Sequence, residues 1–427
     1  MRPTIDATPL AHSLPLVQPA LIDPSAAPAS SASAASSATL SPTIPSVLFV
    51  DQSGQLGGAE FALLQLAGSC IARSEVVLLS DGPFRARLET LGARVQVLND
   101  ARVSGIVRQA SGSNCLRVVP GILRQVRAIA ARARKFDVLF LNTQKALVLG
   151  ALGKPLHRKP VIWYQHDILT REHFGRVQLS VIKWLVRLAV DHVVANSQAS
   201  KRSLIALTGI AADSVPVIYN GVDADAFKRI DDSDIATLRR RLGLPEHAWL
   251  AGLFGRLAPW KGQHIALEAM ARLPGVHLVL VGAPLFGEDA YAQRLHEQAE
   301  ALGVADRVRF AGFQDDVPVW MKAMDVILHT STEPEPFGRV IVEGMAAARP
   351  VIAAAAGGVT EIVRHRRNGW LVKPGDVAAL ADAIGALRDD PALAQRLANQ
   401  ALADAQTEFS VDQYLQRMMQ AIGRAAR

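Results

Sequence analysis

The sequence predicts an α/β protein of two doubly wound parallel sheets in series, preceded by a tail without regular structure. Short apolar runs alternate with helical patterns from residue 46 to residue 410, which is typical of parallel sheets covered by helices on both faces. The alternation is interrupted at the polar connector of residues 231–234 and then restarts. A chain of 427 residues is also too long for one hydrophobic core.

The apolar runs give the predicted strands and, with them, the division of the chain. In the first half we predict strands at residues 47–50, 75–79, 94–98, 137–141, 161–164, 192–195 and 216–219. In the second half we predict strands at residues 250–254, 277–281, 307–310, 326–329 and 351–354. The resulting segments are a disordered Ala/Ser/Pro-rich tail at 1–45, a first domain at 46–222, a second domain at 223–410 and a final helix at 411–427.

Composition excludes several classes of protein. Half of the residues are hydrophobic and 20% are charged, as in globular proteins. Two cysteines, Cys70 and Cys115, make no disulfide framework, so we expect a reducing cytoplasm. No run of eighteen apolar residues occurs, and no continuous apolar core follows Arg2, so we expect neither a membrane-spanning helix nor a signal peptide.

Positive charge is concentrated in the first domain. Residues 46–222 hold 22 Lys and Arg against 11 Asp and Glu, whereas residues 1–45 hold 1 against 2 and residues 223–427 hold 23 against 26. Residues 101–136 carry eight basic residues and no acid. Such a patch fits nucleic acid, an anionic lipid surface or a solvated helix face. The amphipathic pattern at residues 174–190 fits either a membrane surface or a crossover helix of the sheet.

Residues 331–346 contain the pattern around which we interpret the chain. They follow the predicted strand at 326–329 and enter a helical pattern at 340–348, with Gly338 at the turn. The free N–H groups of a helix start suit a phosphate. Glu343, further along the helix, can accept two hydrogen bonds from the diol of a ribose. Together they predict a nucleotide site, although Glu335 and Glu343 as plain surface residues would give the same spacing.

This stretch resembles the retaining glycosyltransferases of family 4. Four other features resemble that family in the same order, namely Phe254-Gly255-Arg256 with Lys261-Gly262, Asn220-Gly221-Val222-Asp223, Gly357-Gly358 with Glu361, and Gly369-Trp370-Leu371-Val372 before Pro374-Gly375-Asp376. The resemblance covers residues 46–427. It implies the GT-B fold, with an acceptor domain, a nucleotide-sugar donor domain and a last helix, near residues 411–424, that crosses back to the first domain.

The resemblance also implies roles for individual residues. Arg256 and Lys261 would neutralise the leaving diphosphate by electrostatic stabilisation. Glu335 would hold the sugar hydroxyls, and His166, at the end of a strand, would contact the sugar from the first domain. The remaining donor-binding residues would be Glu343, Gly338, Phe337, Arg339, Gly57 and Gly58. We expect no metal, because Asp223-Ala224-Asp225 falls at the domain junction and His166 and Asp167 point apart on a strand end.

The expected reaction is hexosyl transfer from a UDP- or GDP-hexose to a hydroxyl acceptor with retention and without a cofactor. With the resemblance, an anionic membrane becomes the favoured partner of the basic first domain, and nucleic acid does not. The acceptor would be lipid-linked or an oligosaccharide, in polysaccharide or glycolipid biosynthesis at the cytoplasmic face of a membrane. Two alternatives share this architecture: a sugar-nucleotide 2-epimerase and a non-catalytic sugar-nucleotide binding protein.

Overall fold

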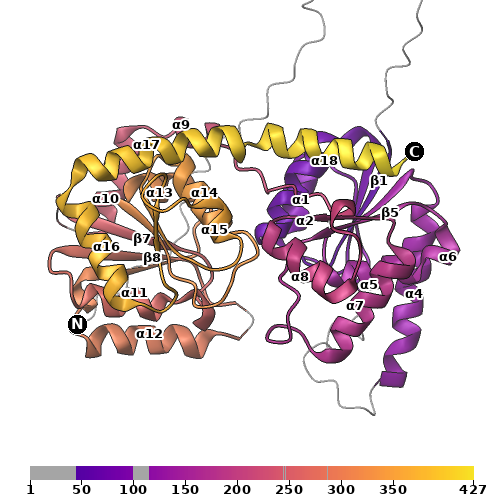
Figure 1. The fold of residues 1–427 in the computed structure, drawn as a ribbon, viewed down its shortest axis with the longest axis horizontal. Coiled ribbons are helices and arrows are strands. Elements are labelled where there is room, and N and C mark those ends of the chain that lie inside the picture. The colour runs from indigo at the N-terminus through magenta and orange to yellow at the C-terminus, as the bar shows by residue number, and fades with distance from the viewer. Residues whose placement is uncertain (1–44, 100–114, 244, 246, 286) are drawn as a thin grey trace, which may run out of the picture. The chain divides into compact units, whose positions relative to one another are not determined.

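The computed structural model describes residues 45–99, 115–243, 245, 247–285 and 287–427, and this part contains two six-stranded sheets in which every pairing is parallel (Figure 1). The predicted arrangement of two doubly wound sheets is therefore confirmed. The predicted tail, up to residue 44, lies outside the described residues, as do residues 101–114 of the acid-free run.

The first sheet has the strand order β3-β2-β1-β4-β5-β6. Its strands are β1 (Val47–Asp51), β2 (Ser74–Leu78), β3 (Val95–Val97), β4 (Val138–Leu141), β5 (Val161–Gln165) and β6 (His192–Ala195). The central strands β1, β4 and β5 are buried along their whole length, as expected where helices cover both faces. The order reverses between β1 and β4, and ligands of such sheets bind at that switch point.

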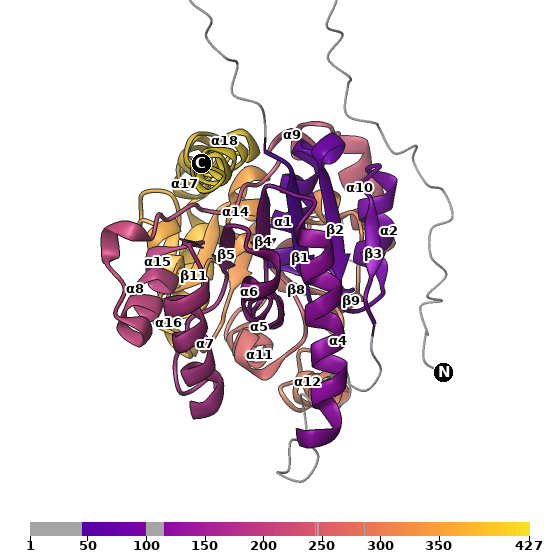
Figure 2. The ribbon, with the colours of Figure 1, turned by 90° about the vertical axis from the view of Figure 1, so that its right-hand side faces the viewer.

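Two helical layers cover this sheet. Leu48 and Val50 of β1 pack in one buried cluster with the first of these layers, while Val47 and Phe49 pack in another with the second. Figures 1 and 2 show the helices of both layers around the sheet. The first layer consists of α4 (Cys115–Ala133), α5 (Gln144–Leu152), α7 (Arg176–Ala189) and α8 (Gln198–Thr208), with the short α6 (Lys154–His157) beside α4 and α5. The second layer consists of α1 (Gly58–Ser69), α2 (Pro83–Thr90) and α18 (Val411–Ala425). Short 3-10 turns, η1 (Ile71–Arg73) and η2 (Ala212–Ser214), complete this half.

The second sheet repeats the topology of the first, in the order β12-β11-β10-β7-β8-β9. Its strands are β7 (Trp249–Phe254), β8 (Val276–Val281), β9 (Val308–Gly312), β10 (Val326–His329), β11 (Val351–Ala354) and β12 (Trp370–Val372). Its helices are α9 (Asp225–Lys228), α10 (Asp232–Arg241), α11 (Gln263–Met270), α12 (Asp289–Ala301), α13 (Val317–Ala323), α14 (Arg339–Ala346), α15 (Val359–Ile362), α16 (Val377–Asp389) and α17 (Pro391–Glu408), with η3 (Pro259–Lys261) and η4 (Ala305–Arg307). The switch point here lies between β7 and β10.

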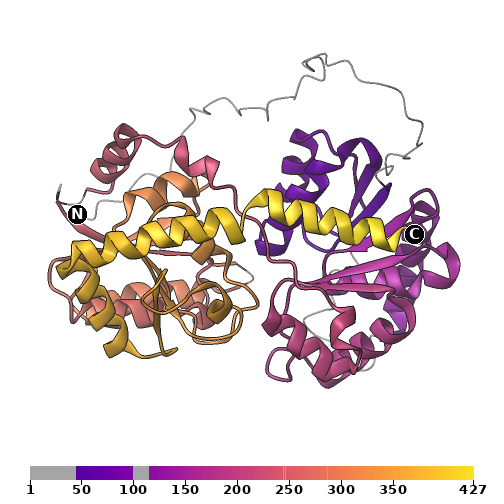
Figure 3. The same ribbon diagram turned by 45° about the horizontal axis from the view of Figure 1, so that its top comes forward.

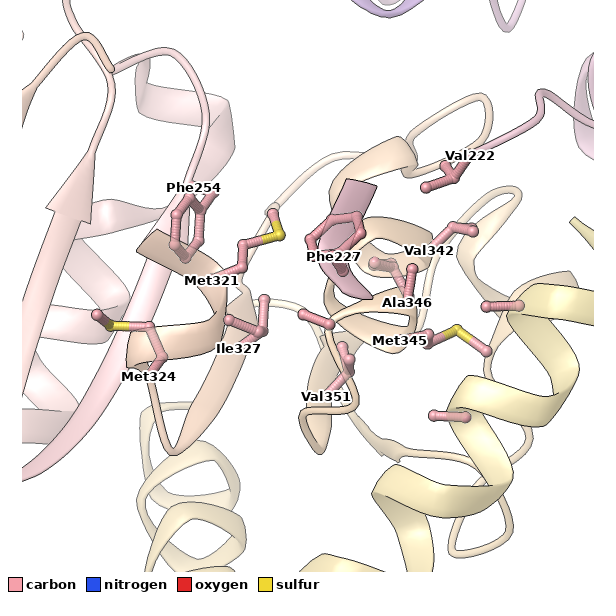
Figure 4. Packing of buried hydrophobic residues seen from close by; sticks show 14 of the residues in the cluster. Val222, Phe227, Phe254, Met321, Met324, Ile327, Val342, Met345, Ala346 and Val351 are labelled. Carbon is pink, nitrogen blue, oxygen red and sulfur yellow. The ribbon is translucent and has the colours of Figure 1, made fainter. Parts of the chain in front are cut away.

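Helix α14 is anchored by its apolar face. Val342, Met345 and Ala346 join the buried cluster on one face of the second sheet, together with Ile327 of β10 and Met321 of α13 (Figure 4). Because Val342, Met345 and Ala346 recur at helical spacing, the opposite face of the helix, with Glu343, is turned away from the cluster. Packing therefore fixes the direction in which Glu343 points.

The C-terminal helices connect the two halves. Helix α17 packs on α14, and α18, which follows it after a short break, packs on α1 and β5 (Figure 3). At the break, Val222 pairs with Ser410, and a Cβ on Gly221 would lie 2.7 Å from the Cα of Val411. This close approach of two chain segments explains the glycine of the Asn220-Gly221-Val222 motif.

Two strand predictions differ from the structure. Residues 216–219, predicted as a strand, form only an isolated bridge between Val217 and Ala195, because the chain turns away from the sheet edge toward the junction with α18. The prediction was therefore wrong. Strand β12, three residues long, was not predicted as a strand because so short a run has no periodicity to detect.

Candidate active site

Glu335 lies at the centre of a buried polar cluster at the carboxyl end of β10. Its Oε1 lies 2.5 Å from Lys261 Nζ, accepts a 2.5 Å hydrogen bond from the Ser331 hydroxyl, and lies 3.0 Å from Nε2 of His329, without hydrogen-bond alignment to that ring. Burial acts to raise the pKa of Glu335, but Lys261 and His329 hold that pKa well below its usual range. The carboxylate is therefore ionised and can accept hydrogen bonds from hydroxyl groups.

Lys261 is placed by the turn that precedes α11. Gly262 has a φ of +72°, and a Cβ there would lie 2.1 Å from the carbonyl oxygen of Thr330, so only glycine allows η3 to approach the end of β10 this closely. Two cationic groups lie over the Trp260 ring, with Lys261 Nζ 4.3 Å and the Arg256 guanidinium 5.8 Å from its centroid. Arg256 and Lys261 are thus brought together, as a diphosphate site requires, although their role stays a prediction.

The start of α14 provides the second part of the predicted donor site. Gly338 precedes the helix with a φ of +100°, and Glu343 accepts a 2.7 Å hydrogen bond from Arg339 Nε. Arg339 also donates to the carbonyl of Gly221 and lies over the Phe61 ring, 5.1 Å from its centroid. In this structure Arg339 therefore orients Glu343 and contacts α1.

The side chain of Phe337 is buried, at 3% exposure, and its ring stacks on Tyr219 at 6.0 Å. Any contact of Phe337 with a ligand would therefore be made through its backbone. The glycine pair after β11 supports the same loop: Cβ atoms on Gly357 and Gly358 would lie 2.2 Å from the carbonyl oxygens of Glu335 and Pro336. The two segments contact each other through backbone atoms, because neither glycine has a side chain, and this contact holds Glu335 in position.

The first sheet presents its own polar cluster at the switch point between β1 and β4. Asn142, after β4, donates from Nδ2 to Asp51 at 2.6 Å and to the Ala59 carbonyl at 3.1 Å. Its Oδ1 must then accept the 3.0 Å hydrogen bond to Nε2 of His166, so the proton of that ring is on Nε2. Burial lowers the pKa of His166 to about 3, so the ring is neutral and can act only by hydrogen bonding and packing.

Glu60, in the first turn of α1, is the other unusual group of this cluster. Burial, followed by the charge of Asp51, raises the pKa of Glu60 to about 8, so the side chain is protonated at neutral pH. A Cβ on Gly57 would lie 2.8 Å from Glu60 Oε2, whereas a Cβ on Gly58 would meet no atom within 4 Å. Gly57 therefore makes room for Glu60, and Gly58 borders open space.

Polar contacts join elements of the first sheet to elements of the second. Glu361 of α15 accepts hydrogen bonds from the amides of Gln198 at 2.7 Å and Ala199 at 2.8 Å, so it caps α8. His173, after β5, lies 3.0 Å from Glu333 in the loop before α14. Glu361, which belongs to the Gly357-Gly358 motif, thus caps a helix of the first half, and its position in the sequence does not reveal this role.

Sequence reasoning missed several members of both clusters. Ser331 begins the motif that we singled out and His329 ends the strand before it, but neither was given a role. Asp51 and Asn142 follow predicted strands, so a search of strand ends would have found them. The carboxylate of Asp223 accepts hydrogen bonds from the amides of Asp225 and Ala226, which makes it a turn cap. Within the described ranges no group of three His, Cys, Asp or Glu side chains is arranged to hold a metal ion.

Comparison with known proteins identifies the family. Models of Glycosyltransferase Family 4 and of Glycosyl transferases group 1 match residues 56–226 and 234–404. The D-inositol 3-phosphate glycosyltransferase of Thermomonospora curvata is 36% identical over 397 residues, covering 85% of this chain and 90% of that enzyme. This chain belongs to glycosyltransferase family 4.

Other family members give the same result. The D-inositol 3-phosphate glycosyltransferase of Acidothermus cellulolyticus is 37% identical over 227 residues, about half of either chain. Alr3699/HepE of Anabaena, in its structure in complex with UDP-glucose, is 40% identical with a TM-score of 0.81, covering 89% of this chain and 100% of that one. The family and the GT-B fold expected from the sequence are confirmed, and this family 4 protein is a glycosyltransferase.

Proposed function

We propose that this glycosyltransferase transfers a hexosyl group from UDP-hexose to a hydroxyl acceptor, with retention and without a metal ion. The bond from the anomeric carbon to the diphosphate breaks, a bond to the acceptor oxygen forms, and the hydroxyl proton leaves with the diphosphate. Arg256 and Lys261 stabilise the departing charge, Glu343 holds the ribose, and Glu335 orients the sugar hydroxyls.

The buried, ionised Glu335 is the observation that carries this proposal. Glu335 is 7% exposed as a residue, yet its carboxylate is charged, because Lys261 supplies a countercharge and Ser331 a hydrogen bond. Lys261 can exchange this contact for a diphosphate, which would leave Glu335 to accept hydrogen bonds from the sugar. An ion pair that serves only stability would not require a position at the switch point between β7 and β10.

UDP is the donor nucleotide that the relatives favour. Alr3699/HepE has been solved with UDP, with UDP and glucose, and with UDP-glucose. Retention is proposed from the family resemblance alone. We identify no carboxylate nucleophile, so we propose no covalent intermediate. An NMR assignment of the product's anomeric configuration tests retention directly.

A thermal-shift panel of UDP, GDP, UDP-glucose, UDP-galactose, UDP-N-acetylglucosamine and GDP-mannose tests the donor. A ligand at a hundred times its Kd should add about 2.7 kcal/mol of apparent stability. Glu343→Gln should weaken UDP binding more than 2′-deoxy-UDP binding if it holds the ribose diol. Release of UDP from the bound sugar nucleotide would establish catalysis; binding without turnover, with any acceptor or water, would instead indicate a binding protein.

We further propose that the enzyme works at the cytoplasmic face of a membrane on a lipid-linked acceptor or oligosaccharide. The excess of positive charge in residues 46–222 supports this location. Among the described residues, no helix is long and apolar enough to cross a bilayer. Sedimentation with phosphatidylglycerol vesicles, weakened as salt shortens the Debye length to about 3 Å at 1 M, tests the location. Protein that stays in the supernatant at low salt would contradict it.

A further inference from the structure

We infer that the outer face of α7, continued by α4, α5 and α6, is the surface on which this protein docks to an anionic lipid bilayer. This inference rests on the proposed membrane location and assigns its contact surface. The proposed contact consists of a stripe of apolar side chains flanked by basic residues, so it does not depend on positive charge alone.

Helix α7 has two apolar faces, of which only one is covered. Leu179, Ile182 and Val186 are buried against the first sheet. On the opposite side, Val177, Val181, Trp184 and Leu188 follow one another at intervals of four, three and four residues, with exposed fractions of 77%, 39%, 59% and 77%. The stripe borders a surface depression of about 430 Å³ that Ser180 also lines.

Exposed apolar side chains concentrate on this helical layer. In the described ranges, eleven large hydrophobic residues are exposed, and eight of them lie on α4, α5, α6 and α7. They are Val119 and Leu123 of α4, Leu152 of α5, Leu156 of α6 and the four residues of α7. These helices are neighbours, since α5 packs against α4, α6 and α7 (Figure 2). Such a concentration marks an interaction surface, whereas single exposed apolar residues do not.

The charges of the same helices identify the partner. The sequences of α4, α5, α6 and α7 contain no Asp or Glu, and α7 alone carries Arg176, Lys183 and Arg187. Lys and Arg beside Trp, Val and Leu are the composition of a helix that lies in the interface of an anionic bilayer. Trp184 suits that depth, because its ring is apolar while its N–H can contact the headgroups.

Other occupants fit this surface less well. A second copy of the chain, docked through the same face about a two-fold axis, would bring basic helices against each other. Nucleic acid would satisfy the cations but would leave the stripe from Val177 to Leu188 without a partner. An anionic bilayer satisfies both features, because its headgroups carry negative charge above an apolar layer.

The test compares matched variants of the full chain on vesicles of phosphatidylglycerol and of phosphatidylcholine. Val177→Ser/Trp184→Ser/Leu188→Ser removes exposed side chains of the stripe, and Leu91→Ser removes an exposed leucine after α2, in the other helical layer. The triple variant should bind phosphatidylglycerol vesicles about tenfold more weakly or worse, and Leu91→Ser should bind like the wild type. Melting temperature and UDP affinity should be unchanged in both.

Two double variants test the contribution of the basic residues to vesicle binding. Arg176→Gln/Arg187→Gln should weaken binding about fivefold per residue, while Arg240→Gln/Arg241→Gln on α10 should not. The described residues include all six tryptophans, and among them only Trp184 is exposed in the wild type. Its emission should shift to the blue on phosphatidylglycerol vesicles and not on phosphatidylcholine.

The outcomes separate this inference from the proposals on which it rests. If the wild type binds vesicles and the α7 variants bind equally well, the membrane location stands and the assignment to α7 is wrong. If the wild type does not bind vesicles, the location itself is wrong, while UDP-glucose binding in solution still tests the donor. If the triple variant converts an oligomer into a monomer without vesicles, the surface is a contact between copies and the inference fails.

Discussion

Replacement of Lys261 tests the reasoning about the donor site most directly. The Lys261–Glu335 pair joins side chains that are 18% and 8% exposed, with 2.5 Å between the charged atoms. Lys261→Met leaves the Glu335 carboxylate buried without its countercharge, which costs about 3–5 kcal/mol in comparable buried pairs. The pKa of Glu335 should then rise, because the group that lowered it most is gone.

The double variant Lys261→Met/Glu335→Gln separates stability from catalysis. With no charge left to bury, it should regain most of the stability that Lys261→Met loses, and the double-mutant cycle measures the coupling of the two residues. Activity should not return, since loss of one electrostatic partner of the transition state typically costs about two to three powers of ten in kcat/KM. Urea unfolding and steady-state kinetics on the preferred sugar nucleotide provide the two measurements. Near-normal turnover of Lys261→Met, in protein that is folded, would refute the diphosphate assignment.

Three further predictions follow from other parts of the structure. Transferase activity should survive excess EDTA, because we propose transfer without a metal; loss of activity that Mg²⁺ or Mn²⁺ restores would contradict this. Because its pKa is raised, Glu60 contributes its full stabilisation below pH 4.5, the ordinary glutamate pKa, and progressively less as the pH rises toward about 8. The urea concentration at the midpoint of unfolding should therefore fall over that range. Glu60→Gln should remove this contribution, and an unchanged pH dependence would show that other groups cause it. Gly262→Ala should destabilise the protein by more than the ~1–2 kcal/mol of a left-handed alanine, because its Cβ would meet the Thr330 carbonyl. Gly243→Ala, at a φ of +62° with no atom within 4 Å, is the matched control and should cost only that strain.

The two sheets and the motif at residues 331–346 can be recognised from the sequence without the structure. Buried parallel strands are continuous apolar runs, so β1, β4, β7 and β10 are visible without any tertiary information. The stretch from Glu335 to Glu343 is recognisable because its loop, helix start and carboxylates are close in sequence. The positive charge of the first half is likewise a property of the residues and not of their arrangement.

Which distant side chains meet could not be predicted from the sequence, because it depends on how the strands are ordered in each sheet. Lys261 and Glu335 are 74 positions apart, and they pair because β7 and β10 are neighbours in the sheet. Asp51, Asn142 and His166 come together in the same way at the ends of β1, β4 and β5. Glu361 became a cap of α8 through packing alone. Local periodicity records which face of an element is buried, whereas strand order, which brings strand ends together, is set by contacts across the whole chain.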